Sequence, residues 1–147
     1  FISDCHLGSE FCNHQKLLDL LSKVECEYLY IVGDFIDGWL LSRKFRWNGN
    51  YNTILQKILR MSRKGTQVYY VWGNHDDFIE PFTDMHFGDN VHVIRETSHI
   101  TLKNEKILQH DNVPYRHYDV IKNLEKIKGN PPKLKTEKYV KIAVIKR

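Results

Sequence analysis

This chain of 147 residues has no long hydrophobic run and only three cysteines. No apolar stretch approaches the roughly 20 residues that cross a bilayer, so the sequence offers no membrane-spanning helix. The cysteines are odd in number and contain no CxxC pair, which argues against a disulfide framework and favours a reducing, cytoplasmic compartment. An initiator methionine and a signal peptide are also absent. Because Phe1-Ile2 reads as the middle of a strand, we expect the natural chain to begin earlier.

Charge is distributed unevenly along the chain. The formal net charge is +4, but residues 121–147 carry nine Lys or Arg and two Glu, which leaves residues 1–120 mildly acidic. A basic tail can contact nucleic acid or anionic lipid, and a solvated segment is an equally good interpretation. The change in composition near residue 121 predicts two parts: a domain portion over 1–120 and a divergent basic tail over 121–147.

Hydrophobic periodicity predicts strands that alternate with helices. We expect a helix that begins after Asn13, and a second that opens at Asn52 or Thr53 and stops at Gly65. The expected strands, the last two forming a hairpin, are 1–3, 28–32, 67–72, 91–94, 99–102 and 106–109. This order implies right-handed crossovers and a largely parallel sheet covered by helices, and therefore an α/β fold.

Three of the predicted strands end in similar polar clusters, "SDCHLG", "GDFID" and "GNHDD". Asp34 and Asp37 taken alone could simply cap turns. Since the carboxyl ends of parallel strands meet at one edge of the sheet, the three clusters are expected to gather there. Asp4 and His6 flank Cys5, so in an extended segment they point to the same side and Cys5 faces the core.

Such a cluster suits a pair of metal ions. Two ions about 3.5 Å apart need oxygen and imidazole ligands and one carboxylate that touches both. Asp4 and His6 can bind one ion together, and Asn74 offers an amide oxygen to the second. Asp34, at the end of the neighbouring strand, is the expected bridge.

The three clusters resemble the signature blocks of the calcineurin-like metallophosphoesterase superfamily in order and approximate separation, over residues 1–113. The chain is most similar to bacterial UDP-2,3-diacylglucosamine diphosphatases. The resemblance implies a layered β-sheet core flanked by helices, incomplete at its C-terminus, and two divalent ions, expected to be Mn²⁺. Its implied metal ligands are Asp4, His6, Asp34, Asn74 and His110; the last lies in "ILQHDN", without the glycine that the family places after this histidine.

The resemblance also implies catalytic roles. His75 would hydrogen-bond a phosphate oxygen or protonate the leaving group. Asp76 would orient His75, and Asp37 would support the loop without touching metal.

The family closes its site with a "GHxH" block that contributes one histidine to each metal. Nothing between Asp111 and Arg147 matches it. The sequence leaves open whether this chain is a fragment, whether the gene has decayed, or whether the tail replaces the block.

Aromatic and basic residues follow the second cluster. Trp39, Arg43 and Trp47 are predicted to contact substrate, as positions in this region do in the relatives, and a solvated loop is the alternative. His86, His92 and His99 have no ligand-like neighbours in the sequence, so we expect surface or partly buried histidines.

The function that the resemblance implies is hydrolysis of a phosphate ester or pyrophosphate. The substrate would be a phosphorylated small molecule or a lipid-linked nucleotide such as UDP-2,3-diacylglucosamine in lipid A biosynthesis, which implies peripheral contact with the inner membrane. Two alternatives remain: a non-catalytic scaffold with an incomplete metal site, favoured by the absent "GHxH", and a nucleic-acid phosphodiesterase, suggested by the basic tail.

Overall fold

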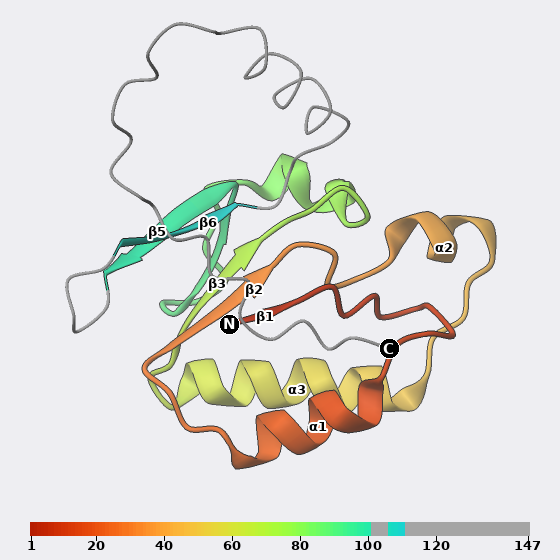
Figure 1. The fold of residues 1–147 in the computed structure, drawn as a ribbon, viewed down its shortest axis with the longest axis horizontal. Helices are drawn as coiled ribbons and strands as arrows, with labels where there is room; N and C mark the ends of the chain where they lie inside the picture. Colours follow the sequence, from red (N-terminus) through yellow and green to blue (C-terminus); the bar gives the residue numbers. More distant parts are fainter. Residues whose placement is uncertain (101–105, 111–147) are drawn as a thin grey trace, which may run out of the picture.

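The computed structural model describes residues 1–100 and 106–110 (Figure 1). The predictions for the basic tail over 121–147 and for the absent "GHxH" block lie outside these residues. The helices and strands, in chain order, are β1 (Ile2–Ser3), α1 (His14–Lys23), β2 (Tyr28–Val32), α2 (Gly38–Arg43), α3 (Gly49–Arg63), β3 (Gln67–Val71), the 3₁₀ helix η1 (Asp77–Phe82), β4 (Val91–Ile94), β5 (Glu96–Ile100) and β6 (Lys106–His110).

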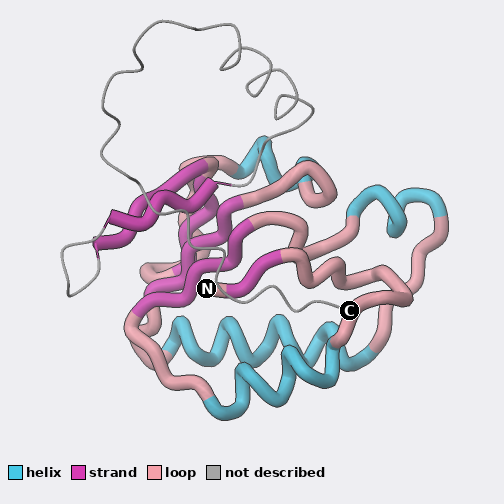
Figure 2. The backbone as a smooth tube through the Cα atoms, viewed as in Figure 1, coloured by secondary structure: helices cyan, strands magenta, loops and turns pink. Residues whose placement is uncertain are grey.

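Four strands form one parallel sheet in the order β1-β2-β3-β4. Helices α1 and α3 lie side by side along one side of the sheet, and the antiparallel β5–β6 hairpin lies on the other side (Figures 1 and 2). The predicted α/β class, with a parallel sheet and flanking helices, is confirmed. Since all four strands run in one direction, the loops that follow β1, β2 and β3 emerge at the same edge.

The main core lies between the sheet and the two helices. Residues that recur at helical spacing on α1 and α3 pack against alternate residues of the strands, so the side chains on this face of the sheet are largely buried. Its most deeply buried apolar side chains include Leu17, Ile54 and Val68, each at most 1% exposed.

An aromatic row runs across the opposite face of the sheet. Phe1, Tyr30, Tyr69 and His92 come from successive strands or their ends, and neighbouring rings stack with centroids 4.8, 5.1 and 4.8 Å apart. The hairpin contacts this row through His99, whose Nδ1 lies 3.0 Å from the Tyr30 hydroxyl. This second face of the sheet is therefore partly polar. His99 lies where the β5–β6 hairpin contacts it, and His92 lies where His86 pairs with β4.

Several predicted boundaries are confirmed and others are wrong. Asn13 caps α1 by accepting a hydrogen bond from the Lys16 backbone N–H. Helix α3 starts earlier than the predicted Asn52 or Thr53, because Asn48 provides the cap and Tyr51 extends its buried face. The short elements α2 and η1 were not predicted. Within the described residues, no helix has the length and apolar character that a membrane crossing requires.

Candidate metal centre

The loops that follow β1, β2 and β3 are joined by backbone hydrogen bonds beyond the ends of the strands. The His6 N–H donates to the Asp34 carbonyl at 2.8 Å, and the Gly38 N–H donates to the His75 carbonyl at 2.8 Å. A side chain at Gly38 would stand 2.9 Å from that carbonyl oxygen, so only glycine allows this approach. The polar residues of three distant segments are thereby brought to one edge, as predicted.

Asp4 and His6 reach the site by a different route from the one predicted. Their φ angles are 52° and 49°, so the segment is not an extended strand but carries residues in the left-handed region. Asp34 has the same conformation, with a φ of 52°. This conformation is uncommon for residues other than glycine, and its clustering here indicates that the surrounding hydrogen bonds impose it. Cys5 between them is buried in the core, as expected.

The side chains of Asp4, His6 and Asp34 converge. One ligand atom from each lies within 4.8 Å of the others. His6 Nε2 and Asp34 Oδ2 are 4.0 Å apart, somewhat wider than the roughly 3.0–3.4 Å between two neighbouring ligands of one ion at about 2.1 Å, so a bound ion would draw them together. Asp34 is only 9% exposed, and burial raises the pKa of its carboxyl. A desolvated carboxylate is stabilised by a nearby cation, so these three donors fit a divalent metal.

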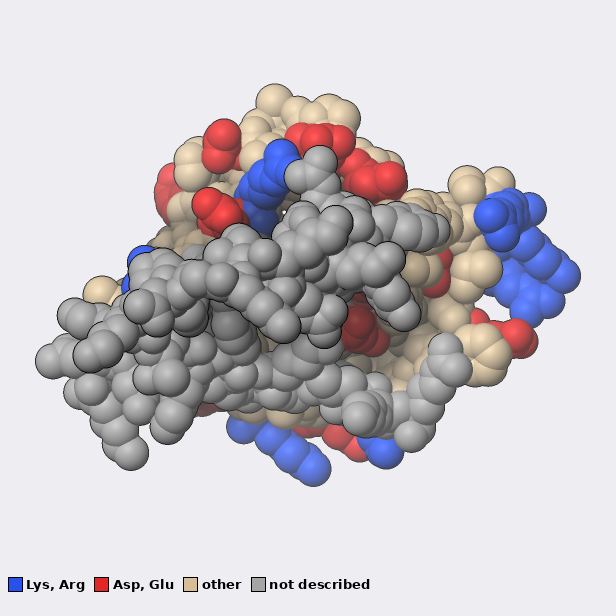
Figure 3. All heavy atoms as spheres, turned by 45° about the horizontal axis from the view of Figure 1, so that its top comes forward, with Lys and Arg blue, Asp and Glu red and all other residues tan. Residues whose placement is uncertain are grey.

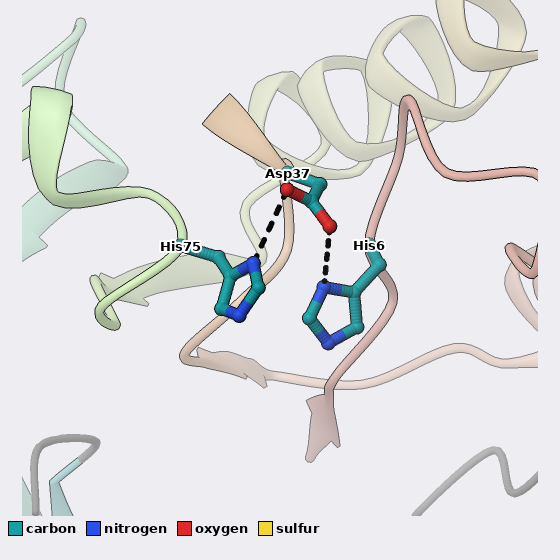
Figure 4. A group of neighbouring side chains, drawn as sticks. All are labelled: His6, Asp37 and His75. Carbon is teal, nitrogen blue, oxygen red and sulfur yellow. Dashed lines mark hydrogen bonds and ion pairs between the residues drawn. The ribbon is translucent and has the colours of Figure 1, made fainter. Parts of the chain in front are cut away.

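Asp37 lies between His6 and His75 (Figure 4). The His6 Nδ1–H donates to Asp37 Oδ2 at 3.1 Å, which leaves the lone pair of His6 on Nε2, facing Asp34. His75 Nδ1 lies 3.1 Å from Asp37 Oδ1, at ion-pair distance, although the angles are not those of a hydrogen bond. A carboxylate on one ring nitrogen fixes which nitrogen remains free for other contacts.

Asp37 also caps α2 by accepting the Leu40 N–H at 2.9 Å, so the predicted loop support is present. Burial by itself would raise the pKa of Asp37, but the bond from Leu40 and the two histidines together hold it below the usual range. The contacts with both histidines were not predicted. The only sequence signal for them was the spacing of three residues between Asp34 and Asp37.

Asp76 was predicted to orient His75, and the structure places its side chain elsewhere. Asp76 has no exposed surface. Its carboxylate accepts hydrogen bonds from the Phe35 N–H at 2.9 Å, the Tyr70 hydroxyl at 2.5 Å and the Gly73 N–H. Burial and this carboxylate raise the pKa of Tyr70, which keeps the hydroxyl a donor. Asp76 therefore joins the loops after β2 and β3, and among the described residues Asp37 holds the position beside the His75 ring.

His75 is fixed on its other sides as well. Its backbone N–H donates to Asp34 Oδ1 at 2.8 Å, and its ring contacts the His6 ring edge to face at 4.7 Å. The indole of Trp39 stacks on His75 with ring centroids 4.4 Å apart. Trp39, predicted to contact substrate, thus covers the imidazole while remaining 42% exposed.

The other predicted site residues are Asn74, His110, Arg43 and Trp47. Asn74 is half-buried in the loop between Gly73 and His75. His110 is the last residue of β6, and its side chain lies outside the described part of the chain. Arg43 is exposed at the end of α2. Trp47 packs against the Tyr51 ring and donates its indole N–H to Asn52, which are structural contacts.

A cleft of about 380 Å³ opens beside the cluster, lined by Asp4, His6, Asp37, His75, Phe11 and Leu40 among others. Basic side chains gather at the end of the molecule that carries α2, whereas acidic side chains are spread over the visible face, most of them toward its top (Figure 3). The cleft therefore combines cation-binding oxygens with imidazoles and apolar walls.

Comparisons with known proteins agree with this geometry. The family described as calcineurin-like phosphoesterase matches residues 1–140. A UDP-2,3-diacylglucosamine hydrolase of Porphyromonas gingivalis is 28% identical over 100 residues, which cover 63% of this chain and 38% of that protein. A protein of the same name from Histophilus somni is 33% identical over 82 residues, covering 52% of this chain and 33% of that one.

The matched stretch thus spans about a third of these relatives' own length. Among solved structures, the nuclease MPE of Pseudomonas putida is 23% identical and covers 63% of this chain and 44% of its own. Its TM-score of 0.34 is too low to support an argument.

The buried carboxylate of Asp76 gives a prediction about stability. In Asp76→Asn an NH₂ group replaces one of the two accepting oxygens and faces hydrogen-bond donors of the surrounding loops. At least one buried donor then loses its acceptor, which costs about 1–3 kcal/mol. We expect the free energy of unfolding in urea to fall by that amount. Asp77→Asn, a change at the exposed neighbouring residue, is the control. Equal free energies of unfolding for Asp76→Asn and Asp77→Asn would contradict the proposed network.

The position of Asp37 gives a prediction about tautomers. Asp37→Asn keeps a capping oxygen for α2 but turns a donor toward His6 Nδ1, so we expect the His6 proton to move to Nε2. Two-bond ¹H–¹⁵N spectra of the histidine side chains distinguish the two tautomers. Asp19→Asn, an exposed change on α1, should leave His6 as in the unmodified chain; an Nδ1–H tautomer that persists in Asp37→Asn would show that Asp37 does not set it.

Proposed function

The chain belongs to the calcineurin-like phosphoesterase family, and on that premise we propose that it acts as a metal-dependent hydrolase of phosphate esters or pyrophosphates. The observation that carries the proposal is the convergence of Asp4, His6 and Asp34, with His6 Nε2 4.0 Å from the Asp34 carboxylate. Convergent oxygen and imidazole donors beside a cleft suit phosphoryl transfer, in which charge on the phosphoryl oxygens must be stabilised.

Asp4, His6 and Asp34 would hold one divalent cation, which we propose to be Mn²⁺. Asn74 and His110 are the proposed ligands of a second, with Asp34 as the bridge. When bound, such ions lower the pKa of a coordinated water and neutralise phosphoryl oxygens. The family's metal dependence and the oxygen-rich donor set support this assignment.

His75 is the proposed proton donor to the leaving oxygen. The carboxylate of Asp37 beside Nδ1 stabilises a positively charged imidazole, which leaves the Nε2–H free to donate toward the cleft. In this proposal Asp37 positions the imidazoles of both His6 and His75. Trp39, stacked on the His75 ring, restricts its rotation and shields one of its faces from water.

For the substrate we propose UDP-2,3-diacylglucosamine or a related lipid-linked nucleotide. The support comes from the names of the curated relatives and from the exposed side chains of Trp39 and Arg43, which can contact a base and a phosphate. A substrate with acyl chains also implies contact with a membrane surface, on the cytoplasmic side in this proposal.

The test is hydrolysis by the chain in the presence of Mn²⁺, with UDP-2,3-diacylglucosamine and bis(p-nitrophenyl) phosphate as substrates. We expect product that EDTA abolishes, and a loss of roughly 10²–10⁴-fold in kcat for His75→Gln, since a general acid typically contributes this much. His14→Gln, on α1, serves as the matched control.

The outcomes separate chemistry from substrate choice. Hydrolysis of the simple diester alone would overturn the lipid-nucleotide assignment and leave the phosphoesterase in place. No hydrolysis of either substrate, or equal kcat in His75→Gln and the control, would overturn the proposed function.

A further inference from the structure

A second pair of histidines, His86 and His92, lies near the amino end of β4, whereas the candidate metal centre lies at the carboxyl ends of the strands. Residues 84–87 run antiparallel to residues 91–93, and His86 pairs with His92 in an isolated bridge. The backbone bonds Phe87 N–H to Val91 carbonyl and Val93 N–H to Met85 carbonyl flank this bridge. The two histidines are therefore directly opposed at a non-hydrogen-bonded position, where cross-strand side chains come closest.

The rings face each other through the same type of nitrogen. His86 Nδ1 and His92 Nδ1 are 2.7 Å apart, and the rings meet edge to face at 4.8 Å. Two neutral imidazoles can approach this closely only if one donates a proton and the other accepts it. The remaining contacts of His92 decide which nitrogen holds the proton.

A chain of hydrogen bonds fixes the polarity of His92. It starts at the backbone carbonyl of Ser62, which can only accept, so the group of Asn90 that faces it at 2.8 Å is the NH₂. The Asn90 oxygen then accepts from the NH₂ of Gln67 at 2.5 Å. The Gln67 oxygen must in turn accept from His92 Nε2–H, at 2.9 Å.

The proton of neutral His92 therefore lies on Nε2, and its Nδ1 carries a lone pair directed at His86. Burial, followed by the neighbouring His86, lowers the pKa of His92, which favours the neutral ring. Tyr69 stacks on the same ring at 4.8 Å and holds its plane. His86 is exposed, so its ring can exchange the Nδ1 proton for one on Nε2 and bond that to water.

We propose that His86 and His92 form a bidentate site for a borderline divalent transition metal such as Zn²⁺ or Ni²⁺, separate from the phosphoesterase centre. Imidazole nitrogens suit these metals, and a ligating histidine commonly donates its other N–H to a carbonyl-type acceptor, as His92 does to Gln67.

Binding an ion requires the two rings to turn as well as to separate. Two nitrogens bound to one ion at about 2.1 Å lie roughly 3.0–3.4 Å apart, and both lone pairs must point at the ion and not at the other nitrogen. Gln67 and Tyr69 hold His92 in place, so the exposed ring of His86 has to supply this rotation and shift. Water completes the coordination, and the bound ion links the two arms of the 84–93 ribbon at the edge of the sheet.

The test is a Zn²⁺ titration of the ¹⁵N-labelled full chain, followed by two-bond ¹H–¹⁵N spectra of the histidine side chains. It is carried out in the Asp34→Asn background, which removes a proposed ligand of the phosphoesterase centre. Without metal, we expect His92 as the Nε2–H tautomer. With Zn²⁺, the Nδ1 signals of His86 and His92 should shift together and saturate with one equivalent at this pair.

Matched variants localise the binding. His86→Gln and His92→Gln should each raise the half-saturating Zn²⁺ concentration by about tenfold or more, whereas His14→Gln should not change it. Gln67→Leu removes the acceptor that orients His92, and a loss of about 10–100-fold in affinity is expected. In that variant the His92 spectrum should also show a mixture of tautomers, which a merely structural role for Gln67 would not produce.

Three results would overturn the proposal. The first is an Nδ1–H tautomer of His92 in the metal-free chain. The second is a shift of only one histidine of the pair, or of neither, at millimolar Zn²⁺. The third is equal affinity in His86→Gln and His14→Gln. Because none of these measurements depends on hydrolysis, failure here leaves the proposed function standing, and loss of activity leaves this site standing.

Discussion

The buried carboxylate of Asp76 constrains the whole polar edge of the sheet. A charged group without water needs strong partners, since its burial otherwise costs several kcal/mol. Its partners are Phe35 after β2, Tyr70 on β3 and Gly73 after β3, so the two loops must approach each other to satisfy it. Once they do, the His75 N–H reaches the Asp34 carboxylate and the Gly38 N–H reaches the His75 carbonyl.

Two histidine pairs in this molecule show how a neighbouring group selects the chemistry of an imidazole. At the carboxyl edge, the carboxylate of Asp37 contacts Nδ1 of both His6 and His75, which favours protonated Nδ1 atoms and leaves the Nε2 atoms for other contacts. At the edge strand, the amide of Gln67 contacts Nε2 of His92, which directs Nδ1 toward His86. The first arrangement adds carboxylates to its donor set and suits harder cations. The second has nitrogen donors alone and suits borderline metals.

The sequence predicted the parallel sheet and the gathering of three loops because each signal is local: an apolar β-rich run followed at once by glycine and a polar cluster. It predicted wrongly how Asp4 and His6 converge, since their left-handed backbone is imposed by hydrogen bonds to a loop some thirty residues away. Helix α2 has six residues, too few for a visible periodicity, although its cap Asp37 was a usable signal.

The partners of Asp76 and the opposition of His86 and His92 were beyond prediction for a related reason. Both depend on register between segments, and a shift of one residue would turn the side chains to the other face. The roles of Asn74, His110 and Arg43 at the site stay predictions.

The most direct measurement is the stoichiometry and affinity of Mn²⁺ binding by calorimetry, with Asp34→Asn as the paired variant. If the three loops form a metal centre, the unmodified chain binds at least one Mn²⁺ and the variant loses it, because the only change is the removal of a negative charge from the proposed bridging ligand. Absence of Mn²⁺ binding in the unmodified chain, or equal binding in both proteins, would contradict the assignment of these carboxylates and imidazoles to a metal.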